Sequence, residues 1–510
     1  MREWGKHFLL AICVLAFLAS GVNAQTQTGS IIGKVTTPEG EVLPGVEVML
    51  SSPNLIGGSQ VDITNENGRF RFTALPPGTY TVETRLSGFT PQKREDIRLS
   101  TEQTLTVDFV LNIGKLDEVV EVIGAAPTID VRDSQTATVE MPKEFLEQIP
   151  SGRSMREQLK FAPGVYGDSH PSVYGSSQSL ANNFMIDGVK ITSPEAGEAE
   201  VNLDYDSIEE MKVMGLGAPA EYGGYSGAVV NTVTKSGGNT VKGLLTFFSQ
   251  LPSWHSANWG NNEDLIRKDW DEVYDFHFNL GGPIAKDKLW YYLSGKYEYW
   301  NVHIEDYEGD TEYGYEARAM GKLNWQITKN DRFTGWLGWQ RDPVFNVEAD
   351  PLNAPEAIPT DIRWQLYWNA SLLHVFSENT FLEGKFGGYF QRGQIELKSD
   401  DPPHFDLVTE ELSGNFWEYW EFPRERYQFN AAVSHHAEDF IAGSHDFKFG
   451  VELEISPLAN RRGYPGGKLY LDLEGEPYIL AQYDGYAAEP TTRRISAFVQ
   501  DSWTIGDRLT

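Results

Sequence analysis

Cysteine and positive charge are both scarce in this sequence. Its 510 residues contain one cysteine, Cys13, and 42 lysines and arginines against 73 aspartates and glutamates. A single cysteine cannot form an intramolecular disulfide or a cysteine-ligated metal site. Because a net charge of −31 repels the phosphate backbone, nucleic acid is excluded as a partner. The acidic excess instead indicates a well-solvated surface.

Long apolar runs are missing after residue 24. The opening residues, MREWGKHFLLAICVLAFLASGVNAQ, combine a basic start, an apolar run from Phe8 to Leu18 and a small residue at Ala24. This pattern is typical of a secretory signal peptide cut after Ala24. A membrane anchor is the alternative, but the run is short for a spanning helix. No later stretch approaches about 18 consecutive apolar residues, so any further membrane crossing must use strands.

Two globular patterns follow the signal peptide. Residues 28–112 contain short strand-like runs such as SIIGKVT, GVEVMLS and GRFRFTA, separated by turn residues, which predicts a small β-sandwich. Residues 137–235 mix helical segments such as SMREQLKFAPG with strands such as NFMIDGVKIT and SIEEMKVMG, which predicts an α+β domain. Between them lies LDEVVEVIG, an extended apolar segment that can add to the sheet edge of a partner or form an ordinary edge strand.

From Thr240 onward, about ten segments alternate apolar and polar residues. In LWYYLSGKYEYW, one face carries Leu289, Tyr291 and Leu293, and the other carries Lys296 and Glu298. The segments cover residues 240–250, 272–281, 287–300, 314–327, 331–341, 363–376, 379–392, 425–436, 445–455 and 491–503. Short and long connections alternate between them, which is the pattern of an outer-membrane barrel. We therefore expect the apolar faces to contact lipid and the polar faces to line a lumen.

Particular motifs resemble known families. The residues GKVTTPEGEVLPGVEVML and NENGRFRFTALPPGTYTVETRLSGF resemble the carboxypeptidase regulatory-like domain, a prealbumin-like β-sandwich. The residues LDEVVEVIG, NFMIDGV, SIEEMKVM, AEYGGYSGAVVNTVTKSGGN and NLGGPIAKDKLWYYLSGKYEY resemble, in the same order, TonB-dependent outer-membrane receptors of the Oar-like branch.

The resemblance implies a mainly β chain with four parts. These are a signal peptide at 1–24, a regulatory-like sandwich at 25–113, a TonB box with an α+β plug at 114–236, and the N-terminal part of an antiparallel transmembrane β-barrel at 237–510. The family's barrel has 22 strands, and an open sheet in lipid leaves unpaired backbone groups. We therefore expect the natural protein to continue beyond Thr510.

The resemblance also implies active transport across the outer membrane. A ligand would bind the outer loops and the plug, and TonB, with its inner-membrane energising complex, would engage the TonB box. The expected box residues are Leu116, Asp117, Glu118, Val119 and Val120. Other expected partners are outer-membrane lipid, an unidentified extracellular ligand and a surface lipoprotein, and the regulatory-like domain would lie in the periplasm. An adhesion or secretion-associated protein that uses the barrel as a platform is the alternative.

Motifs for catalysis are missing from the sequence. It has no glycine-rich phosphate loop, no G-x-S-x-G elbow and no EF-hand pattern. His435 and Glu438 have the spacing of a metallocarboxypeptidase zinc pair, but a zinc site needs a third ligand. His170 and His404 are single loop histidines, for which solvation is the expected state. We therefore expect no enzyme activity, no cofactor and no metal.

Two long connections contain side chains that could bind a ligand. Clustered acids can attract cations or basic ligands, and aromatic rings can stack on sugars or peptide side chains. The alternative is a solvated acidic loop and an interfacial aromatic belt. The acids are Glu305, Asp306, Glu308, Asp310 and Glu312, and the aromatics are Phe416, Trp417, Tyr419, Trp420 and Phe422.

Overall fold

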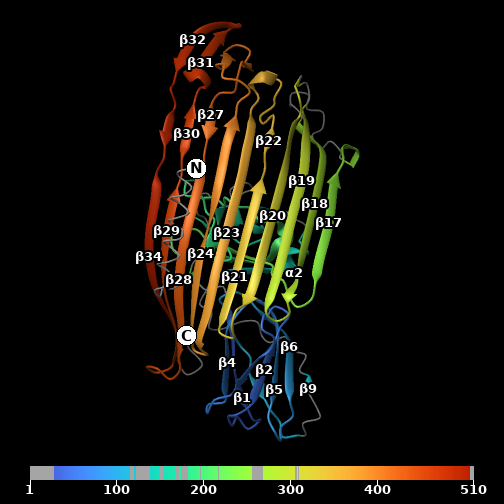
Figure 1. The fold of residues 1–510 in the computed structure, drawn as a ribbon, viewed down its shortest axis with the longest axis vertical. Helices are drawn as coiled ribbons and strands as arrows, with labels where there is room; N and C mark the ends of the chain where they lie inside the picture. The colour runs from blue at the N-terminus through green and yellow to red at the C-terminus, as the bar shows by residue number, and fades with distance from the viewer. Residues whose placement is uncertain are drawn as a thin grey trace.

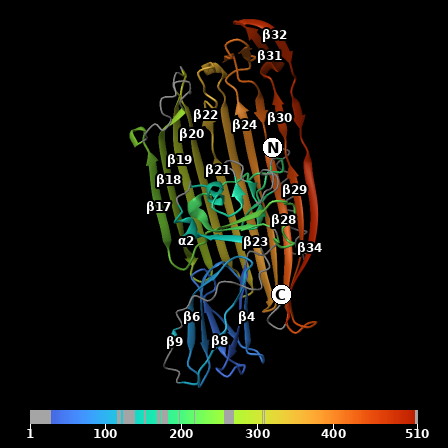
Figure 2. The ribbon, with the colours of Figure 1, turned by 180° about the vertical axis from the view of Figure 1, so that it is seen from behind.

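The computed structural model describes residues 28–114, 120–121, 138–149, 153–166, 172–173, 182–195, 197–215, 217–254, 268–304, 307 and 309–505. A small β-sandwich lies at one end of a tall sheet, and a third domain lies against one face of that sheet (Figures 1 and 2). Below, these parts are called the sandwich (residues 29–110), the wall (the sheet of long strands between residues 242 and 504) and the plug (residues 138–234). No helix of the described residues is long and apolar enough to cross a membrane. The signal peptide lies outside the described residues.

The sandwich consists of two sheets that enclose an apolar core. One sheet has the order β4-β1-β7, with β8 also on β1, and the other has the order β3-β2-β5-β6-β9. Along β1, buried and half-buried residues alternate, so that Ile31 and Val35 point into the core against Leu50 and Tyr80. The strands are β1 (Gly29–Thr36), β2 (Glu47–Ser51), β3 (Gln60–Ile63), β4 (Arg69–Leu75), β5 (Gly78–Arg85), β6 (Gln92–Leu99), β7 (Thr104–Thr106), β8 (Phe109–Val110) and β9 (Val120–Glu121).

The plug contains a five-stranded sheet in the order β10-β15-β16-β13-β14. The segment NFMIDGVKIT, predicted as one strand, is a hairpin, because Asp187 and Gly188 turn the chain at positive φ. Its helices are single turns, and the Ser154 hydroxyl caps α3 by accepting a hydrogen bond from the Glu157 N–H. The elements are β10 (Thr138–Pro142), α2 (Lys143–Leu146), α3 (Met155–Leu159), β11 (Val165–Tyr166), β12 (Ser172–Val173), β13 (Asn183–Ile186), β14 (Val189–Lys190), η2 (Tyr205–Ser207), β15 (Ile208–Met214) and β16 (Val229–Thr234).

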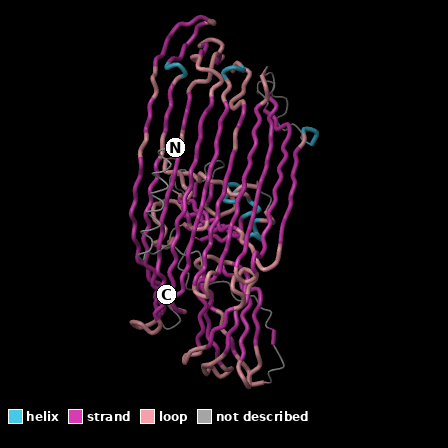
Figure 3. The backbone as a smooth tube through the Cα atoms, viewed as in Figure 1, coloured by secondary structure: helices cyan, strands magenta, loops and turns pink. Residues whose placement is uncertain are grey.

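The wall is an antiparallel sheet of long strands (Figure 3), and each predicted strand has a counterpart in it. Among the described residues, β17 and β34 each pair with one neighbour and form its edges. The long strands are β17 (Lys242–Gln250), β18 (Lys268–Ala285), β19 (Leu289–Ile304), β20 (Glu312–Gln326), β21 (Asp331–Arg341), β23 (Thr360–Ser377), β24 (Thr380–Glu396), β28 (Arg424–Ala437), β29 (Ser444–Pro457) and β34 (Thr491–Thr504). The predicted fold class, mainly β with a sandwich, an α+β domain and an antiparallel barrel sheet, is confirmed.

The long connections contain more structure than predicted. Four short strands extend the wall: β22 (Val344–Phe345), β27 (Tyr419–Glu421), β30 (Asn460–Gly463) and β33 (Tyr486–Ala488). A separate sheet forms at the end of the wall far from the sandwich (Figure 1), in the order β26-β25-β31-β32. Its strands are β25 (His404–Asp406), β26 (Leu412–Ser413), β31 (Lys468–Leu473) and β32 (Glu476–Gln482). Strands from two different long connections thus pair with each other, which the sequence analysis did not predict.

The two faces of the wall follow the predicted alternation. On β19, Leu293 is 44% and Tyr297 49% exposed, whereas Lys296 is 7% exposed. On β29, Leu453 is 43% exposed and Glu454 2%. The apolar set therefore points away from the plug and the charged set points towards it, as expected of a lipid face and a lumen face.

The sandwich contacts both the wall and the plug. Its Arg71 forms an ion pair of 2.6 Å with Asp446, at the start of β29. On the plug side, the Thr101 hydroxyl donates a hydrogen bond to Glu210 Oε1 at 3.2 Å, and Lys212 Nζ donates to the Thr101 carbonyl at 3.1 Å. Burial, reinforced by the nearby Glu140, raises the pKa of Glu210 to about 7.

The raised pKa of Glu210 predicts that stability around this contact depends on pH. Glu210 binds its proton more tightly in the folded protein than in the unfolded chain, where the ordinary pKa is 4.5, so the free energy of unfolding of this region falls as pH rises from 4.5 through about 7. Amide hydrogen exchange around Thr101, corrected for intrinsic rates, should show stronger protection at about pH 5.5 than at about pH 8.5. Glu210→Gln should reduce this difference, and equal protection of the unaltered protein at both pH values would contradict the prediction.

The outward face of the wall predicts sensitivity to charge. Leu337 on β21 is 54% exposed, so Leu337→Arg would place a charge in the lipid and lower the free energy of unfolding by about 2–4 kcal/mol near mid-membrane. Denaturant titration in lipid vesicles measures this change. The control is Leu480→Arg in β32, where water surrounds the side chain and a change within about 0.5 kcal/mol is expected. Similar effects at both positions would contradict the assignment of the lipid face.

Candidate functional site at the plug–wall interface

A buried ion pair joins β14 of the plug to β29 of the wall. Lys190 Nζ lies 2.6 Å from Glu452 Oε1, and both residues are buried. The Lys190 backbone N–H also donates to Gln428 Oε1 at 3.0 Å. Glu452 and Gln428 lie on the polar face that the alternation of β29 and β28 directs inward. The plug therefore satisfies polar groups of the wall that would otherwise need water.

A second contact joins the turn of the plug hairpin to β20. Lys322 Nζ lies 3.3 Å from Asp187 Oδ2 and donates hydrogen bonds to Thr234, to its carbonyl at 3.0 Å and its hydroxyl at 2.8 Å. The Thr234 hydroxyl donates in turn to Asp187 Oδ2 at 2.6 Å. Asp187 adopts positive φ, which aspartate tolerates better than most residues. One lysine of the wall thus holds the turn and the last plug strand together.

A third contact lies nearer the outer end of the wall. The Arg424 guanidinium contacts Glu200 Oε1 and Glu195 Oε2, both at 2.8 Å. Burial raises the pKa of Glu200, and the charge of Arg424 opposes that shift. Gln365 Nε2 on β23 also donates to the Glu200 carbonyl at 2.8 Å. The segment that follows the hairpin is therefore fixed to two wall strands.

One apolar cluster is shared by the plug and the wall. The core of the plug includes Phe184, Ile186 and Met211, and inward-facing wall residues close it on one side. These wall residues are Tyr292, Met320, Trp336, Tyr367 and Tyr389. Buried ion pairs gain little net free energy, because desolvation of the charges offsets their attraction. The interface between plug and wall is therefore specific and well packed. Many of its interactions are ion pairs and hydrogen bonds, which water can replace when it enters.

A cavity of about 420 Å³ lies between the sandwich, the plug and the wall. Charged side chains of the plug and the wall line it, together with uncharged sandwich residues such as Asn54 and Pro77, and we call it the polar cavity. Its charged lining residues are Lys143, Lys235, Lys242, Lys322, Arg332, Lys385, Glu147, Asp187, Glu209 and Glu383. Such a cavity is suited to water and polar solutes, and it lies at the sandwich end of the plug.

The predicted TonB box is described at one position. Val120 belongs to β9, whose backbone pairs in parallel with β6 through Val120↔Gln92 and Glu121↔Lys93. Leu116, Asp117, Glu118 and Val119 lie outside the described residues. For Val120 and Glu121 the backbone thus forms an edge strand of the sandwich, which was one of the two interpretations of this segment.

The long-connection aromatics are packed against other side chains. The Arg462 guanidinium lies 3.7 Å from the Trp420 ring centroid, and Phe405 and Trp417 rings lie 4.8 Å apart. Phe422 is buried between Arg363 and Arg424. Of the acidic set, Asp310 and Glu312 are described, whereas Glu305, Asp306 and Glu308 are not.

The histidines singled out in the sequence have separate partners. His435 Nδ1 lies 2.8 Å from the Thr380 hydroxyl, and Glu438 forms an ion pair of 3.3 Å with Arg69. His404 is not simply solvated, because its Nδ1 lies 2.9 Å from Asp472 Oδ2. β25 and β31, which pair in the outer sheet, bring the two residues together. His170 lies outside the described residues.

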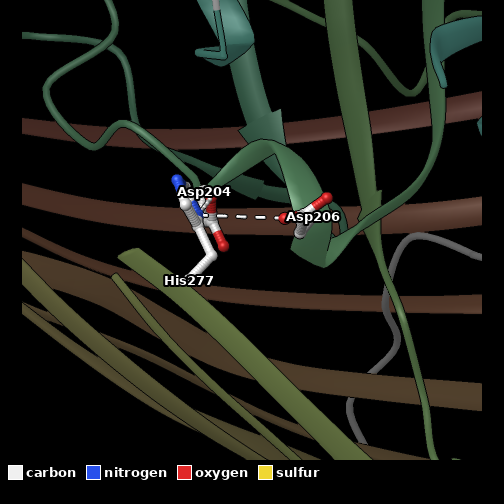
Figure 4. Close-up of side chains that lie close together, drawn as sticks. All are labelled: Asp204, Asp206 and His277. Atoms are coloured by element: carbon white, nitrogen blue, oxygen red, sulfur yellow. Dashed lines mark ion pairs between the residues drawn. The ribbon is translucent and has the colours of Figure 1, made fainter. Parts of the chain in front are cut away.

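One group of potential metal ligands was missed in the sequence. Asp204 and Asp206 flank the start of η2, and His277 lies opposite them on β18 (Figure 4). The available signal was the pair of motifs D-x-D at 204–206 and D-x-H at 275–277. In a strand, residues two apart share a face, so Asp275 and His277 both point inward.

The comparisons with known proteins agree with this architecture. Residues 30–112 match the carboxypeptidase regulatory-like domain. The TonB-dependent transporter Oar of Myxococcus xanthus is 32% identical, in an alignment that covers 100% of this chain and 58% of Oar. The chain thus spans less than two thirds of the length of that relative.

Solved structures share the fold. The outer membrane transporter YddB from Escherichia coli has a TM-score of 0.57 at 14% identity, covering 72% of this chain and 54% of YddB. The siderophore receptor PirA from Acinetobacter baumannii has a TM-score of 0.51 at 18% identity, covering 72% of this chain and 54% of PirA. These likenesses concern the fold; the similarity to Oar and the apolar outer face of the wall place the chain in the outer membrane. The chain is therefore related to the TonB-dependent outer-membrane receptors, with a carboxypeptidase regulatory-like domain before its plug.

Proposed function

We propose that this chain belongs to a protein that transports a ligand across the outer membrane by TonB-dependent active transport. The observation that carries the proposal is the plug, a folded domain held against the polar face of the wall by buried ion pairs such as Lys190–Glu452. A domain in that place obstructs passive diffusion, so a ligand can pass only when the plug moves. Transport is the proposed role, and no catalytic step is part of it.

The arrangement of the plug sheet supports a pulling mechanism. β10 lies at one edge of that sheet, and within the described residues its one partner strand is β15. A pulling force on the chain before Thr138 therefore acts on an edge strand. Separating β10 from β15 breaks one ladder of backbone hydrogen bonds. Removal of β10 would expose the side of the plug that carries Glu209 and Lys143, both in the lining of the polar cavity. We propose that this cavity widens into the route for the ligand.

The sandwich supplies the attachment point in this proposal. TonB would pair with the segment Leu116 to Val120 by adding a strand, which relies on main-chain hydrogen bonds. Part of that segment already pairs with β6 through Val120. TonB would therefore compete with β6 for the backbone N–H and C=O groups of this segment. The sandwich and the TonB box would face the periplasm, and the sheet of β25, β26, β31 and β32 would face the outside.

The ligand would bind at the outer sheet and the adjoining plug surface. Aromatic and arginine side chains gather there, as in the contact of Trp420 with Arg462. Siderophore receptors are among the related proteins, but no described side chain of this chain selects one ligand class. A surface lipoprotein that delivers the ligand is a further proposed partner.

A proline in the TonB box tests the coupling. Val119→Pro removes a backbone N–H from the segment, whereas Val119→Ala keeps it and serves as the matched control. We expect Val119→Pro to weaken binding to the periplasmic domain of TonB about tenfold, corresponding to about one or two lost hydrogen bonds. Titration calorimetry with the purified domain measures this.

In cells, Val119→Pro should abolish uptake and leave ligand binding at the surface intact. The ligand can be found as the nutrient whose limitation induces expression. Unchanged TonB affinity and unchanged uptake in Val119→Pro would favour the alternative, a barrel used as a platform for adhesion or secretion.

A further inference from the structure

His277 is surrounded by carboxylates where the plug meets β18. Its Nδ1 lies 2.7 Å from Asp204 Oδ1 and 3.9 Å from Asp206 Oδ2. The two aspartates are each 5% exposed and His277 is 1% exposed. Figure 4 shows the imidazole and the two carboxylates converging, with one ligand atom from each lying within 4.8 Å of the others. The group joins two residues of the plug to one of the wall.

The other side of the imidazole is held by a third carboxylate. His277 Nε2 lies 2.6 Å from Asp275 Oδ1. In metal sites, a ligating histidine usually donates its second ring N–H to a carboxylate, which fixes the tautomer. With the proton on Nε2, the lone pair of Nδ1 points at the carboxylate of Asp204. A lone pair and a carboxylate at 2.7 Å repel each other unless a cation or a proton lies between them.

The charge of the surroundings favours a divalent cation over a proton. Arg153 forms ion pairs with two of the three carboxylates: it lies 2.6 Å from Asp206 and 3.7 Å from Asp275. A proton on His277 would still leave one negative charge uncompensated, whereas a divalent ion with a neutral imidazole balances the group. Two wall cations, Arg318 and Lys296, border a small cavity beside Asp204, and both form ion pairs with Glu316.

An unsatisfied atom marks the same place. Asp204 Oδ2 is buried and accepts no hydrogen bond in the described part of the chain. A buried carboxylate oxygen without a donor is costly, so such atoms usually have a partner. A metal ion between the two aspartates and Nδ1 would supply one.

We propose that Asp204, Asp206 and His277 bind a divalent first-row transition-metal ion, with Asp275 orienting the imidazole. Imidazole with carboxylates suits Zn²⁺ and its neighbours, whereas Ca²⁺ and Mg²⁺ prefer oxygen ligands. Tetrahedral ligands about 2.0–2.2 Å from zinc lie roughly 3.3–3.5 Å apart. The distances of 2.7 and 3.9 Å from Nδ1 lie on either side of that spacing, so small side-chain shifts suffice.

The ion would tie the plug to the wall. Asp204 and Asp206 belong to the segment that leads into β15, the strand that holds β10. A metal link at this place would hold the centre of the plug sheet while its edge strand is pulled away. The site differs from the polar cavity and from the outer surface, and it does not depend on transport.

Zinc binding to the protein isolated from outer membranes tests the proposal. After treatment with a chelator, the protein is dialysed against buffered Zn²⁺ and its metal content is measured by mass spectrometry. We expect about one equivalent bound by this site, and at least about a tenfold loss of affinity in Asp206→Asn and in His277→Gln. The matched control is His374→Gln, because His374 contacts one carboxylate, Asp331, at 2.7 Å. The control should bind zinc like the unaltered protein.

A second measurement covers variants that fail to fold. Co²⁺ added to the unaltered, metal-free protein should give visible absorption bands of a low-symmetry site, and Zn²⁺ should displace them. Resistance of the unheated protein to detergent unfolding reports folding of each variant. The proposal is overturned if the unaltered protein binds no zinc and gives no cobalt spectrum, which is the result expected of a protonated His277. It is also overturned if folded His277→Gln binds zinc as tightly as the control.

Discussion

The pairing of charges across the plug–wall interface is the constraint on which the rest of the structure depends. Lipid requires an apolar outer face, and the period of two along a strand then leaves every second side chain for the inner face. In this chain those inner side chains include Glu452, Lys322 and Arg424. A charge in the interior needs water or a counter-charge, and the plug supplies the counter-charges from its hairpin and the segment after it. The shape of the plug therefore follows from the chemistry of the wall.

In the proposed transport the plug must be both retained and displaced, and the same constraint suits this. Removing one partner of a buried pair leaves a stranded charge, so a single substitution is expected to be costly. If water reaches both partners at once, the cost in free energy is much smaller, because hydration of the two charges replaces their attraction. The polar cavity beside Lys322 and Lys385 brings water to the edge of this interface. The apolar part of the contact, where Tyr292 and Tyr389 meet the plug core, is then the part that resists movement.

The sequence predicted those features of the fold that depend on residues close together in the chain. The strands of the wall were predictable because alternation is a property of each segment and a lipid face enforces it strictly. The hairpin at Asp187 was misread as a single strand, since a two-residue turn leaves the alternation on either side intact. The outer sheet was missed because it pairs β25 with β31, which belong to different connections. The same reason applies to Asp204 and His277, whose contact depends on where the plug lies and not on either motif.

The transport proposal depends on movement of the plug relative to the wall. A disulfide between Val189→Cys on β14 and Gly387→Cys on β24 would tether the two, since a Cβ at position 387 would lie 2.6 Å from a Val189 methyl group. Cys13, the one cysteine of this sequence, lies in the predicted signal peptide, so residues 25–510 offer no competing thiol. The decisive measurement is ligand uptake by cells that carry this pair, with each single variant as a control. If the plug must move, uptake stops in the oxidised protein and returns on reduction, while surface binding is unchanged. Full uptake through a completely oxidised tether would contradict the proposal.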